Sequence, residues 1–504
     1  MRSLRSMRLL LLLFVIVNLN PVLAQEGKGE DGAAHAKGSA GNPASRLPAD
    51  SVTQHTITLQ GQELKYKATA GTLPLTGSKG EVAAKVFYVA YTVEDKGSRP
   101  VTFAFNGGPG AGAAFLNLGA LGPRIVPFKD NGAAPVQPVQ MADNPDCWLG
   151  FTDLVFVDPV GTGFSRATTG GEEAERTYWG VDKDIDSIAQ VVRLYLTQNG
   201  RELAPIFLAG ESYGGFRTAM LSPKLLGMGF HLKGAVMISP ALEFSMLRGD
   251  DYEILPLTFE LPSITAANVE MRGGPSASLD EVRQAEIYSR TTYLVHLAEG
   301  LTKDDAVDAA LAKFTGLEPS LIARHHGRVS AQLFKREYLK RNDRALSSYD
   351  ATVSVPVSRP SEHSHFDPIL DSAVTVLAPA MTAYAAKELG FHTTLDYRLL
   401  NRQVSGHWDF GIKPGRQGYA GSLDELEQAR ERNLSLRFLI VHGYTDLVTP
   451  YEMSMYLINQ LRPIEGAAPN EIRVHRGGHM MYLRPASRAE LEKDAQELYA
   501  AASK

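Results

Sequence analysis

The sequence contains three residue types that together can activate a hydroxyl group, in the order serine, aspartate, histidine. Ser212 lies in residues 210–214 (GESYG), which fit the pattern G-x-S-x-G. A serine hydroxyl becomes a nucleophile when a histidine accepts its proton and a carboxylate orients that histidine. Asp446 and His479 follow Ser212 in the chain order that this pattern requires. These residues predict acyl transfer through a covalent intermediate on Ser212.

The serine motif lies between two predicted elements, an apolar strand at 206–209 and a helix that continues from Phe216. A sharp turn from strand to helix holds the Ser212 hydroxyl at the end of the sheet, in a strained conformation that tolerates only small neighbours. Glycines occupy the neighbouring positions: Gly210, Gly214 and Gly215. The turn also places the Tyr213 backbone N–H at a helix N-terminus, where it can stabilise an oxyanion.

A second glycine-rich loop, residues 106–110 (NGGPG), follows a predicted strand at 101–105. No side chains obstruct its glycine N–H groups, so the loop can supply the other half of an oxyanion hole beside Ser212. A plain glycine turn and a phosphate-binding loop are the alternatives. No G-K-[ST] sequence follows, which excludes a Walker-type loop.

The candidate acid and base each follow a predicted strand. Asp446 comes after the strand at 438–442, and His479 comes after the strand at 472–474. The carboxyl ends of strands are where α/β sheets place ligands and chemistry. Both side chains are therefore expected at the edge of the sheet that carries Ser212.

Other residues fit these roles less well. His442 and His475 lie inside predicted strands and are expected to be packed or surface residues. Asp158 ends an earlier strand but precedes the serine, which breaks the chain order. His363 and His365 are spaced like a metal-binding pair, but no third ligand accompanies them, so we expect exposed loop residues. No metal or other cofactor is predicted.

The remaining elements must bring these loops together. Apolar runs at 153–158 and 235–238 predict further strands, and residues 181–196 place their apolar side chains on one helical face. Alternating strands and helices predict an α/β protein with a mainly parallel central sheet covered on both faces. Together with the serine turn, this pattern predicts the α/β-hydrolase fold.

The interval 241–404 differs from its flanks because it is rich in predicted helices and lacks regular strand spacing. We interpret it as a helical cap inserted between two parts of one hydrolase core, 51–240 and 405–504. An independent domain is the alternative. The insertion is favoured because strands and candidate catalytic residues occur on both sides of the interval.

The N-terminus predicts export. Residues 1–24 combine three arginines, an unbroken apolar run at 9–17 and small residues before a cleavage position after Ala24. A membrane span needs about 20 apolar residues, so a cleaved signal peptide is favoured over an uncleaved anchor. Residues 25–50 are rich in Gly, Ala and charge and predict a flexible linker. We expect a periplasmic or secreted protein without stable membrane association after cleavage.

The composition excludes some partners and leaves others open. The net charge of −5 gives no support to nucleic-acid binding. Cys147 is the only cysteine, so no intrachain disulfide can form, and an exported protein of this kind is typical of bacteria. The oligomeric state and the side-chain preference of the site do not follow from the sequence.

Four segments together resemble the serine carboxypeptidases and occur in that family's order. They are residues 106–110 (NGGPG), 158–165 (DPVGTGFS), 210–215 (GESYGG) and 478–480 (GHM). The resemblance implies a peptidase that removes single residues from the C-termini of peptide substrates, with Ser212, Asp446 and His479 as its catalytic triad.

The same resemblance implies roles for the residues around the serine. Gly108 and Tyr213 would donate the N–H groups of the oxyanion hole. Asn106, Gly107 and Glu211 would hold the terminal carboxylate of the substrate.

The sequence also departs from the family pattern. Ala104 stands where the family has a tryptophan, and residues 111–113 (AGA) replace the segment that carries a cysteine. Ala120 stands where the family has a second glutamate that partners the one beside the serine. These changes leave the triad intact and affect the expected carboxylate site.

Glu211 predicts a dependence on pH. Ionised, it would repel a substrate carboxylate, whereas in its protonated form it can donate a hydrogen bond to that group. Burial raises the pKa of a carboxyl group, so binding of a C-terminal carboxylate should be favoured at acidic pH. The alternative is that Glu211 only braces the turn through a backbone hydrogen bond.

Three functions follow from these observations. The first is a serine-type carboxypeptidase. The second is an esterase or acyltransferase on the same scaffold, which needs the triad but not Glu211. The third is a non-catalytic exported binding protein, which has no need for Ser212, Asp446 and His479 together.

Overall fold

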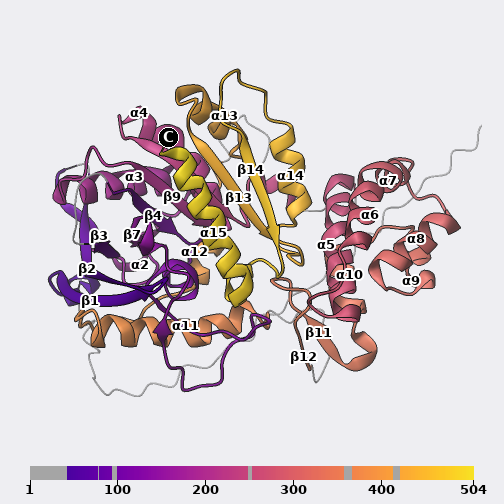
Figure 1. Cartoon of the computed structure of the whole chain (residues 1–504), viewed down its shortest axis with the longest axis horizontal. Helices are drawn as coiled ribbons and strands as arrows, with labels where there is room; N and C mark the ends of the chain where they lie inside the picture. The colour runs from indigo at the N-terminus through magenta and orange to yellow at the C-terminus, as the bar shows by residue number, and fades with distance from the viewer. Residues whose placement is uncertain are drawn as a thin grey trace, which may run out of the picture. The chain divides into compact units, whose positions relative to one another are not determined.

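The computed structural model describes residues 42–77, 79–93, 99–247, 252–356, 366–411 and 420–503. These residues form a central β-sheet flanked by helices, together with a second group of helices (Figure 1). The predicted signal peptide and most of the predicted linker lie outside the described residues.

The strands of the central sheet follow the order β1-β2-β3-β7-β4-β9-β10-β13-β14, and β8 pairs with β3. They are β1 (Ser51–Leu59), β2 (Gln62–Thr76), β3 (Val82–Val93), β4 (Val101–Phe105), β7 (Asp153–Val157), β8 (Arg166–Ala167), β9 (Ile206–Glu211), β10 (Leu232–Ile238), β13 (Arg437–Gly443) and β14 (Asn470–His475). From β7 to β14 each neighbouring pair is parallel, so the carboxyl ends of these strands lie at one edge. This confirms the predicted parallel sheet.

Three antiparallel strands, which the sequence pattern above does not predict, precede the parallel part. β1 pairs with β2, β2 with β3, and β3 continues onto β7, all antiparallel. β1 alternates between more and less exposed residues along most of its length. A strand of this kind carries many polar residues because one of its faces meets water, so it lacks the continuous apolar run of a central strand.

Two apolar clusters fill the two faces of the sheet. On one face, α11 (Leu370–Lys387) and α15 (Pro485–Ala502) bury residues such as Leu377 and Leu491. The cluster on the other face includes residues of α3 (Val181–Gln198), α4 (Tyr213–Gly227), α13 (Leu423–Arg432) and α14 (Tyr451–Asn459). The helix predicted at 181–196 is therefore confirmed as α3.

Short elements connect the layers. They are η1 (Pro43–Arg46), α1 (Ala114–Leu116), η2 (Asn117–Leu121), β5 (Arg124–Ile125), β6 (Ala142–Asp143), η3 (Trp148–Gly150), α2 (Gly171–Arg176), η4 (Phe244–Met246), α12 (Arg402–Gly406) and η7 (Met481–Leu483).

The cap is a separate helical group with its own apolar cluster, which includes Ile264 and Leu311. Its elements are α5 (Ile254–Gly273), α6 (Asp280–Tyr288), η5 (Ser289–Tyr293), α7 (Leu294–Ala298), α8 (Asp305–Thr315), α9 (Pro319–Arg324), α10 (Ala331–Glu337), η6 (Lys340–Asn342), β11 (Arg344–Leu346) and β12 (Ser354–Pro356). The predicted boundary at residue 404 differs from the structure, because α11 packs into the main core. Helical periodicity cannot tell which apolar cluster a helix joins.

The end of the predicted linker also differs from the structure. Residues 42–50 begin with η1, where the Asn42 side chain accepts a hydrogen bond from the N–H of Ala44. Ala44 and Leu47 are only 1% and 6% exposed and belong to the main core. These two apolar side chains fix the segment to the domain despite its polar composition.

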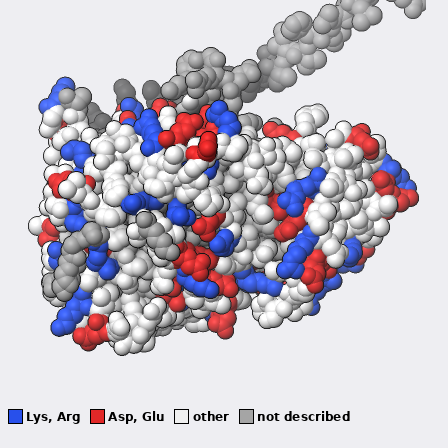
Figure 2. All heavy atoms as spheres, turned by 45° about the horizontal axis from the view of Figure 1, so that its top comes forward, with Lys and Arg blue, Asp and Glu red and all other residues white. Residues whose placement is uncertain are grey.

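The surface carries both signs of charge. On the face shown in Figure 2, Lys and Arg side chains lie among Asp and Glu side chains. Among the helices that the structure describes, none has both the length and the apolar character needed to cross a membrane.

Candidate active site

The predicted strand-to-helix turn is present at Ser212. β9 ends at Glu211 and α4 begins at Tyr213, which leaves Ser212 between them with φ 59° and ψ −121°. A positive φ is unfavourable for a residue with a side chain and persists only where the surroundings enforce it. The strained conformation predicted for the serine is therefore observed.

Close backbone contacts explain two of the neighbouring glycines. A Cβ on Gly210 would lie 2.0 Å from the carbonyl oxygen of Gly214. A Cβ on Gly214 would lie 2.4 Å from the carbonyl oxygen of Phe105, at the end of β4. Any larger residue at either position would push the turn away from the strand on which it rests.

The NGGPG loop reaches the serine because β4 lies beside β9 in the sheet. A Cβ on Gly107 would lie 2.6 Å from the backbone nitrogen of Tyr213 and 2.8 Å from Cβ of Ser212. Gly108 follows with φ +102° and is exposed. The structure thus brings together the two segments predicted to form an oxyanion hole.

Asp446 and His479 form a buried hydrogen-bonded pair. Nδ1 of His479 lies 2.8 Å from Oδ2 of Asp446. The other carboxylate oxygen accepts hydrogen bonds from the N–H groups of Val448 and Thr449, at 2.7 Å and 3.0 Å. Nε2 of His479 has no hydrogen-bond partner among the described residues. That nitrogen is available to accept a proton.

The pairing favours the ionised acid. Burial acts to raise the pKa of Asp446, but the charge of His479 and the hydrogen bonds to the carboxylate outweigh it and lower the pKa. Burial acts to lower the pKa of His479, but Asp446, assisted by Glu211 and Asp367, raises it. A carboxylate that stabilises the protonated imidazole in this way is what a histidine general base requires.

Thr449 contacts both members of this pair, although the sequence does not predict that contact. Its hydroxyl oxygen lies 2.8 Å from Oδ2 of Asp446 and 3.0 Å from Nδ1 of His479. The hydroxyl also lies 3.0 Å from the carbonyl oxygen of Ser239. This contact connects the loop after β13 that carries Asp446, called the acid loop below, to the end of β10. A threonine three residues after an aspartate is a common turn pattern, and this is the only local signal.

Glu211 is buried beside the serine and faces two predicted site residues. Its Oε2 accepts a hydrogen bond from Nδ2 of Asn106 at 3.1 Å, and its Oε1 lies 3.5 Å from Nε2 of His479. Burial raises the pKa of Glu211, against the opposing effects of His479, Asn106 and the N–H of Gly107. Asn106, Gly107 and Glu211 therefore form one cluster next to the candidate base.

The departures from the family pattern lie close to this cluster. Ala104 and Ala120 are both fully buried. A Cβ on Gly119, the neighbour of Ala120, would lie 3.5 Å from the ring of Tyr482. The hydroxyl of Tyr482 is buried near Glu211 and Asn106, and burial raises its pKa well above the usual value. Sequence reasoning had no signal for this tyrosine, because it comes near Ala120 only through the fold.

The competing residues have other environments. His442 is fully buried, and burial lowers its pKa to about 4. His475 is held between Asp494 at 2.7 Å and Glu490 at 2.9 Å. Asp158 accepts hydrogen bonds from the backbone of neighbouring loops and from a tyrosine, which gives it a structural role.

Within the described ranges, no group of three or more His, Cys, Asp or Glu side chains is placed to hold a metal ion. His363 and His365 lie outside the described residues. Cys147 is buried, and burial raises the pKa of its thiol to about 12.

Comparison with known proteins adds to this geometry. Residues 60–238 match the family described as serine carboxypeptidase. The serine-type carboxypeptidase F of Aspergillus niger is 29% identical over 182 residues, which are 34% of this chain and 30% of that protein. The pheromone-processing carboxypeptidase of Cryptococcus gattii is 32% identical over 147 residues, which are 28% of this chain and 20% of that protein. The chain thus matches about a third or less of the length of these two relatives.

Solved structures share the fold over a longer stretch. A prohormone-processing carboxypeptidase from Saccharomyces cerevisiae superimposes with a TM-score of 0.51 and 15% identity, over 85% of this chain and 91% of that one. At that identity the likeness shows the fold, which is the α/β-hydrolase fold predicted from the sequence. Residues 60–238 are therefore similar to the serine carboxypeptidase family, and the chain has the α/β-hydrolase fold.

Proposed function

We propose that this chain is a serine-type carboxypeptidase that hydrolyses the C-terminal peptide bond of peptides. The observation that carries the proposal is the arrangement around His479. Its Nδ1 is bonded to Asp446, and its Nε2 lies 3.5 Å from Glu211, which immediately precedes Ser212. The contact between the candidate base and Glu211, the residue that precedes the candidate nucleophile, supports both the triad and the carboxylate site of this proposal.

In the first half of the reaction, Nε2 of His479 accepts the proton of the Ser212 hydroxyl as Oγ attacks the scissile carbonyl carbon. The carbonyl electron pair moves onto oxygen, next to the N–H groups of Gly108 and Tyr213 in the proposed oxyanion hole. When the tetrahedral species collapses, the C–N bond breaks and His479 gives its proton to the leaving amine. The released amine is the C-terminal amino acid.

In the second half, a water molecule attacks the acyl ester on Ser212 while His479 accepts a proton from the water. Collapse breaks the ester bond, and the proton returns to Oγ of Ser212. Asp446 remains ionised throughout, in line with its lowered pKa. Its role is to hold the ring and stabilise the imidazolium that forms in each half.

In this proposal, Asn106, Gly107 and Glu211 bind the terminal carboxylate of the substrate. Because burial raises the pKa of Glu211, its protonated form persists to higher pH than that of an exposed glutamate. The protonated form donates a hydrogen bond to the substrate carboxylate, and the ionised form repels it. The proposed enzyme is therefore favoured at acidic pH.

An esterase or acyltransferase on the same scaffold is the second candidate. Ala120 favours it, since the second acid that would partner Glu211 is absent and its place is buried among apolar residues. Such an enzyme would use the same three residues and would not need a free carboxylate on its substrate.

One experiment separates the two functions. The purified protein is incubated with a blocked dipeptide as free acid, as C-terminal amide and as ester, and the products are identified by mass spectrometry. Release of the C-terminal amino acid mainly from the free acid supports the carboxypeptidase. Cleavage of the ester alone supports the second candidate.

We also propose that the protein is exported after cleavage following Ala24. The basic, apolar and small residues of 1–24 support this proposal. N-terminal sequencing of the protein from its native host should begin at Gln25, whereas a retained Met1 would contradict cleavage.

A further inference from the structure

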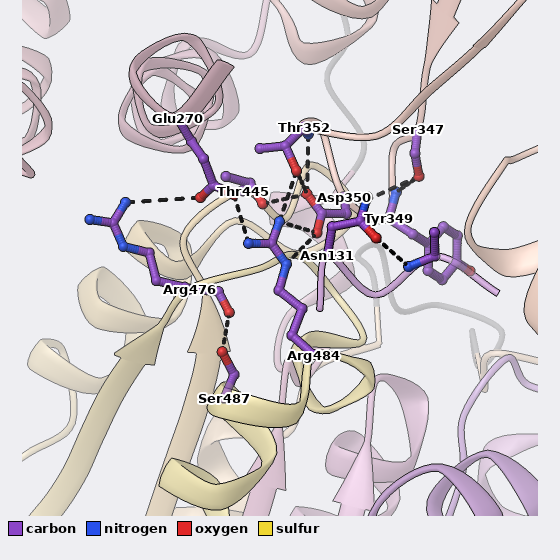
Figure 3. A network of polar contacts seen from close by, with 11 residues as sticks. Asn131, Glu270, Ser347, Tyr349, Asp350, Thr352, Thr445, Arg476, Arg484 and Ser487 are labelled. Atoms are coloured by element: carbon purple, nitrogen blue, oxygen red, sulfur yellow. Dashed lines mark hydrogen bonds and ion pairs between the residues drawn. The ribbon is translucent and has the colours of Figure 1, made fainter. Parts of the chain in front are cut away.

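We propose that the tip of the β11–β12 hairpin, Ser347–Val353, is a positioning device that holds the Asp446 and His479 loops in their catalytic arrangement. The hairpin belongs to the cap, and Figure 3 shows its tip beside the residues that anchor it. This inference rests on the proposed function, because it assigns a role to residues that act through Asp446 and His479.

The hairpin tip is bonded to the acid loop on both sides of Asp446. The hydroxyl of Thr445 donates to Oδ1 of Asp350 at 2.8 Å, and the carbonyl of Thr445 accepts from the N–H of Ala351 at 3.1 Å. On the other side of Asp446, the N–H of Leu447 donates to the carbonyl of Ser348 at 3.0 Å. The acid loop is therefore fixed by the cap immediately before and immediately after the catalytic carboxylate.

The same tip contacts the loop after β14 that carries His479, called the histidine loop below. The backbone N–H of His479 donates to the carbonyl oxygen of Tyr349, and the Tyr349 ring packs edge-on against the imidazole with ring centres 5.1 Å apart. A Cβ on Gly478 would lie 1.8 Å from the Tyr349 carbonyl oxygen and 2.6 Å from Cα of Asp350. The hairpin tip and the histidine loop are therefore in direct backbone contact.

Arg484 anchors the hairpin tip to the core (Figure 3). Its guanidinium donates to Oδ2 of Asp350 through Nη2 at 2.7 Å and Nε at 3.2 Å, and to the hydroxyl of Thr352 at 2.8 Å. A further bond of 2.6 Å reaches Oε1 of Glu270 on α5. Arg484 precedes α15, five residues after His479, so this one side chain links the cap to the segment that carries the base.

Because these ion pairs are buried, removing one partner is costly. The side chains of Asp350, Arg484 and Glu270 are 6%, 5% and 7% exposed. A buried ion pair that loses one partner leaves an unpaired charge, which is costly, so the surrounding loops rearrange rather than leave it unsatisfied. The loops within reach are those of Asp446 and His479. Loss of the Asp350 charge should therefore disturb catalysis as well as stability.

The test measures the rate at which a fluorophosphonate labels Ser212 in the full-length protein, as a function of pH. Labelling requires neutral His479, so the rate rises through the pKa of that residue. We expect Asp350→Asn to lower the rate about tenfold to a hundredfold, the range for a catalytic group displaced by up to an ångström. The midpoint should also move to lower pH, because a looser Asp446 raises the pKa of His479 less.

Two further variants keep the test decisive. Thr445→Val removes one hydrogen bond and leaves both charges in place, so it should fold and show a smaller shift in the same direction. Asp153→Asn is the matched control, since Asp153 is 2% exposed and pairs with Arg99 and Arg201 at the start of β7, away from the carboxyl ends of the strands. It should be less stable but be labelled at the wild-type rate and midpoint.

The groups that face His479 are Asp446, Glu211 and Asp367, together with the rings of Tyr349 and His442. None of the variants removes these groups, and Thr445→Val also changes no charge, so a shifted midpoint in Thr445→Val reports a change in the position of the groups around His479.

Wild-type rate and midpoint in folded Asp350→Asn or Thr445→Val would overturn the inference. A lower fraction of labelled protein with an unchanged midpoint would also overturn the inference. That result would indicate that Asp350 and Thr445 stabilise the fold without positioning His479. If the wild type itself is not labelled, the nucleophile assignment fails and the inference fails with it.

Discussion

Oε1 of Glu211 lies 3.5 Å from Nε2 of His479, on the opposite side of the imidazole ring from the hydrogen bond to Asp446. The candidate base thus has a carboxyl group at each end of its ring. The pKa of Asp446 is lowered and that of Glu211 is raised, chiefly by the charge of His479 in the first case and by burial in the second. Two acids whose environments separate their pKa values are suited to different roles. We assign Asp446 to orienting the base and Glu211 to the substrate.

Replacing Ser212 with Ala should abolish turnover and fluorophosphonate labelling. The residues of a triad act as a unit, so the loss in kcat should be roughly 10⁴- to 10⁶-fold. The fold should be retained, because Ser212 is partly exposed and alanine is smaller. The measurement is labelling followed by peptide mapping, with thermal unfolding as the control. Full labelling of the Ser212→Ala protein would show that another residue is the nucleophile.

His479→Ala should be about as damaging as Ser212→Ala, whereas His475→Ala should retain activity. Both ring nitrogens of His475 are paired, with Asp494 and Glu490, so neither is free to act as the base. Both variants are compared by kcat/KM on one peptide. Loss of activity in a folded His475→Ala protein, with activity kept in His479→Ala, would contradict the choice of base.

Thr449→Val should lower kcat with little change in KM. The variant keeps the shape of the side chain but removes the hydroxyl that faces Asp446, His479 and the carbonyl of Ser239. A hydrogen bond to a charged group contributes about 1.5–3 kcal/mol, so we expect a loss of about tenfold or more in kcat. The measurement is steady-state kinetics on one peptide. An unchanged kcat would show that the backbone N–H donors alone hold Asp446 in its catalytic position.

The sequence is sufficient to predict a candidate site because that site depends on local patterns. The strained turn at Ser212 needs glycines at fixed positions, and the strands before Asp446 and His479 are short apolar runs between polar segments. Each of these signals lies within a few residues of the group that it positions. The parallel sheet then brings the loops together, because the carboxyl ends of its strands meet at one edge.

Features that depend on distant contacts were not predictable in the same way. The sequence predicts a cap that ends at residue 404, but α11 joins the main core through side chains such as Val376 and Met381. The antiparallel strands β1 and β2 lack continuous apolar runs, whereas β3 has one at residues 86–91 that the strand prediction leaves out. The ion pair between Asp350 and Arg484 joins residues that are far apart in the sequence, and no local sequence pattern predicts such a contact.

Thiol reagents should not inactivate the enzyme. Cys147 is buried, and with a pKa raised to about 12 by burial its thiol carries almost no thiolate near neutral pH. Activity should persist after incubation with iodoacetamide, and mass spectrometry should find Cys147 unmodified in the folded protein. Rapid loss of activity together with modification at Cys147 would show that this region opens in solution.

The central claim is that Glu211 recognises the substrate carboxylate in its protonated form, next to the Ser212–His479–Asp446 triad. The decisive measurement is the pH profile of kcat/KM for one peptide as free acid and as amide, in wild type and Glu211→Gln. In wild type, efficiency on the free acid should fall as pH rises through the raised pKa of Glu211, and efficiency on the amide should not. Glu211→Gln keeps a donor that does not ionise, so it should flatten this decline.

Glu211→Ala serves as the companion variant. It removes the donor and should lower efficiency on the free acid by about tenfold to a hundredfold, the equivalent of one charge-assisted hydrogen bond, with little effect on the amide. The account predicts divergent wild-type profiles for the two substrates above the pKa of Glu211. Parallel profiles would contradict it and would favour the esterase or acyltransferase.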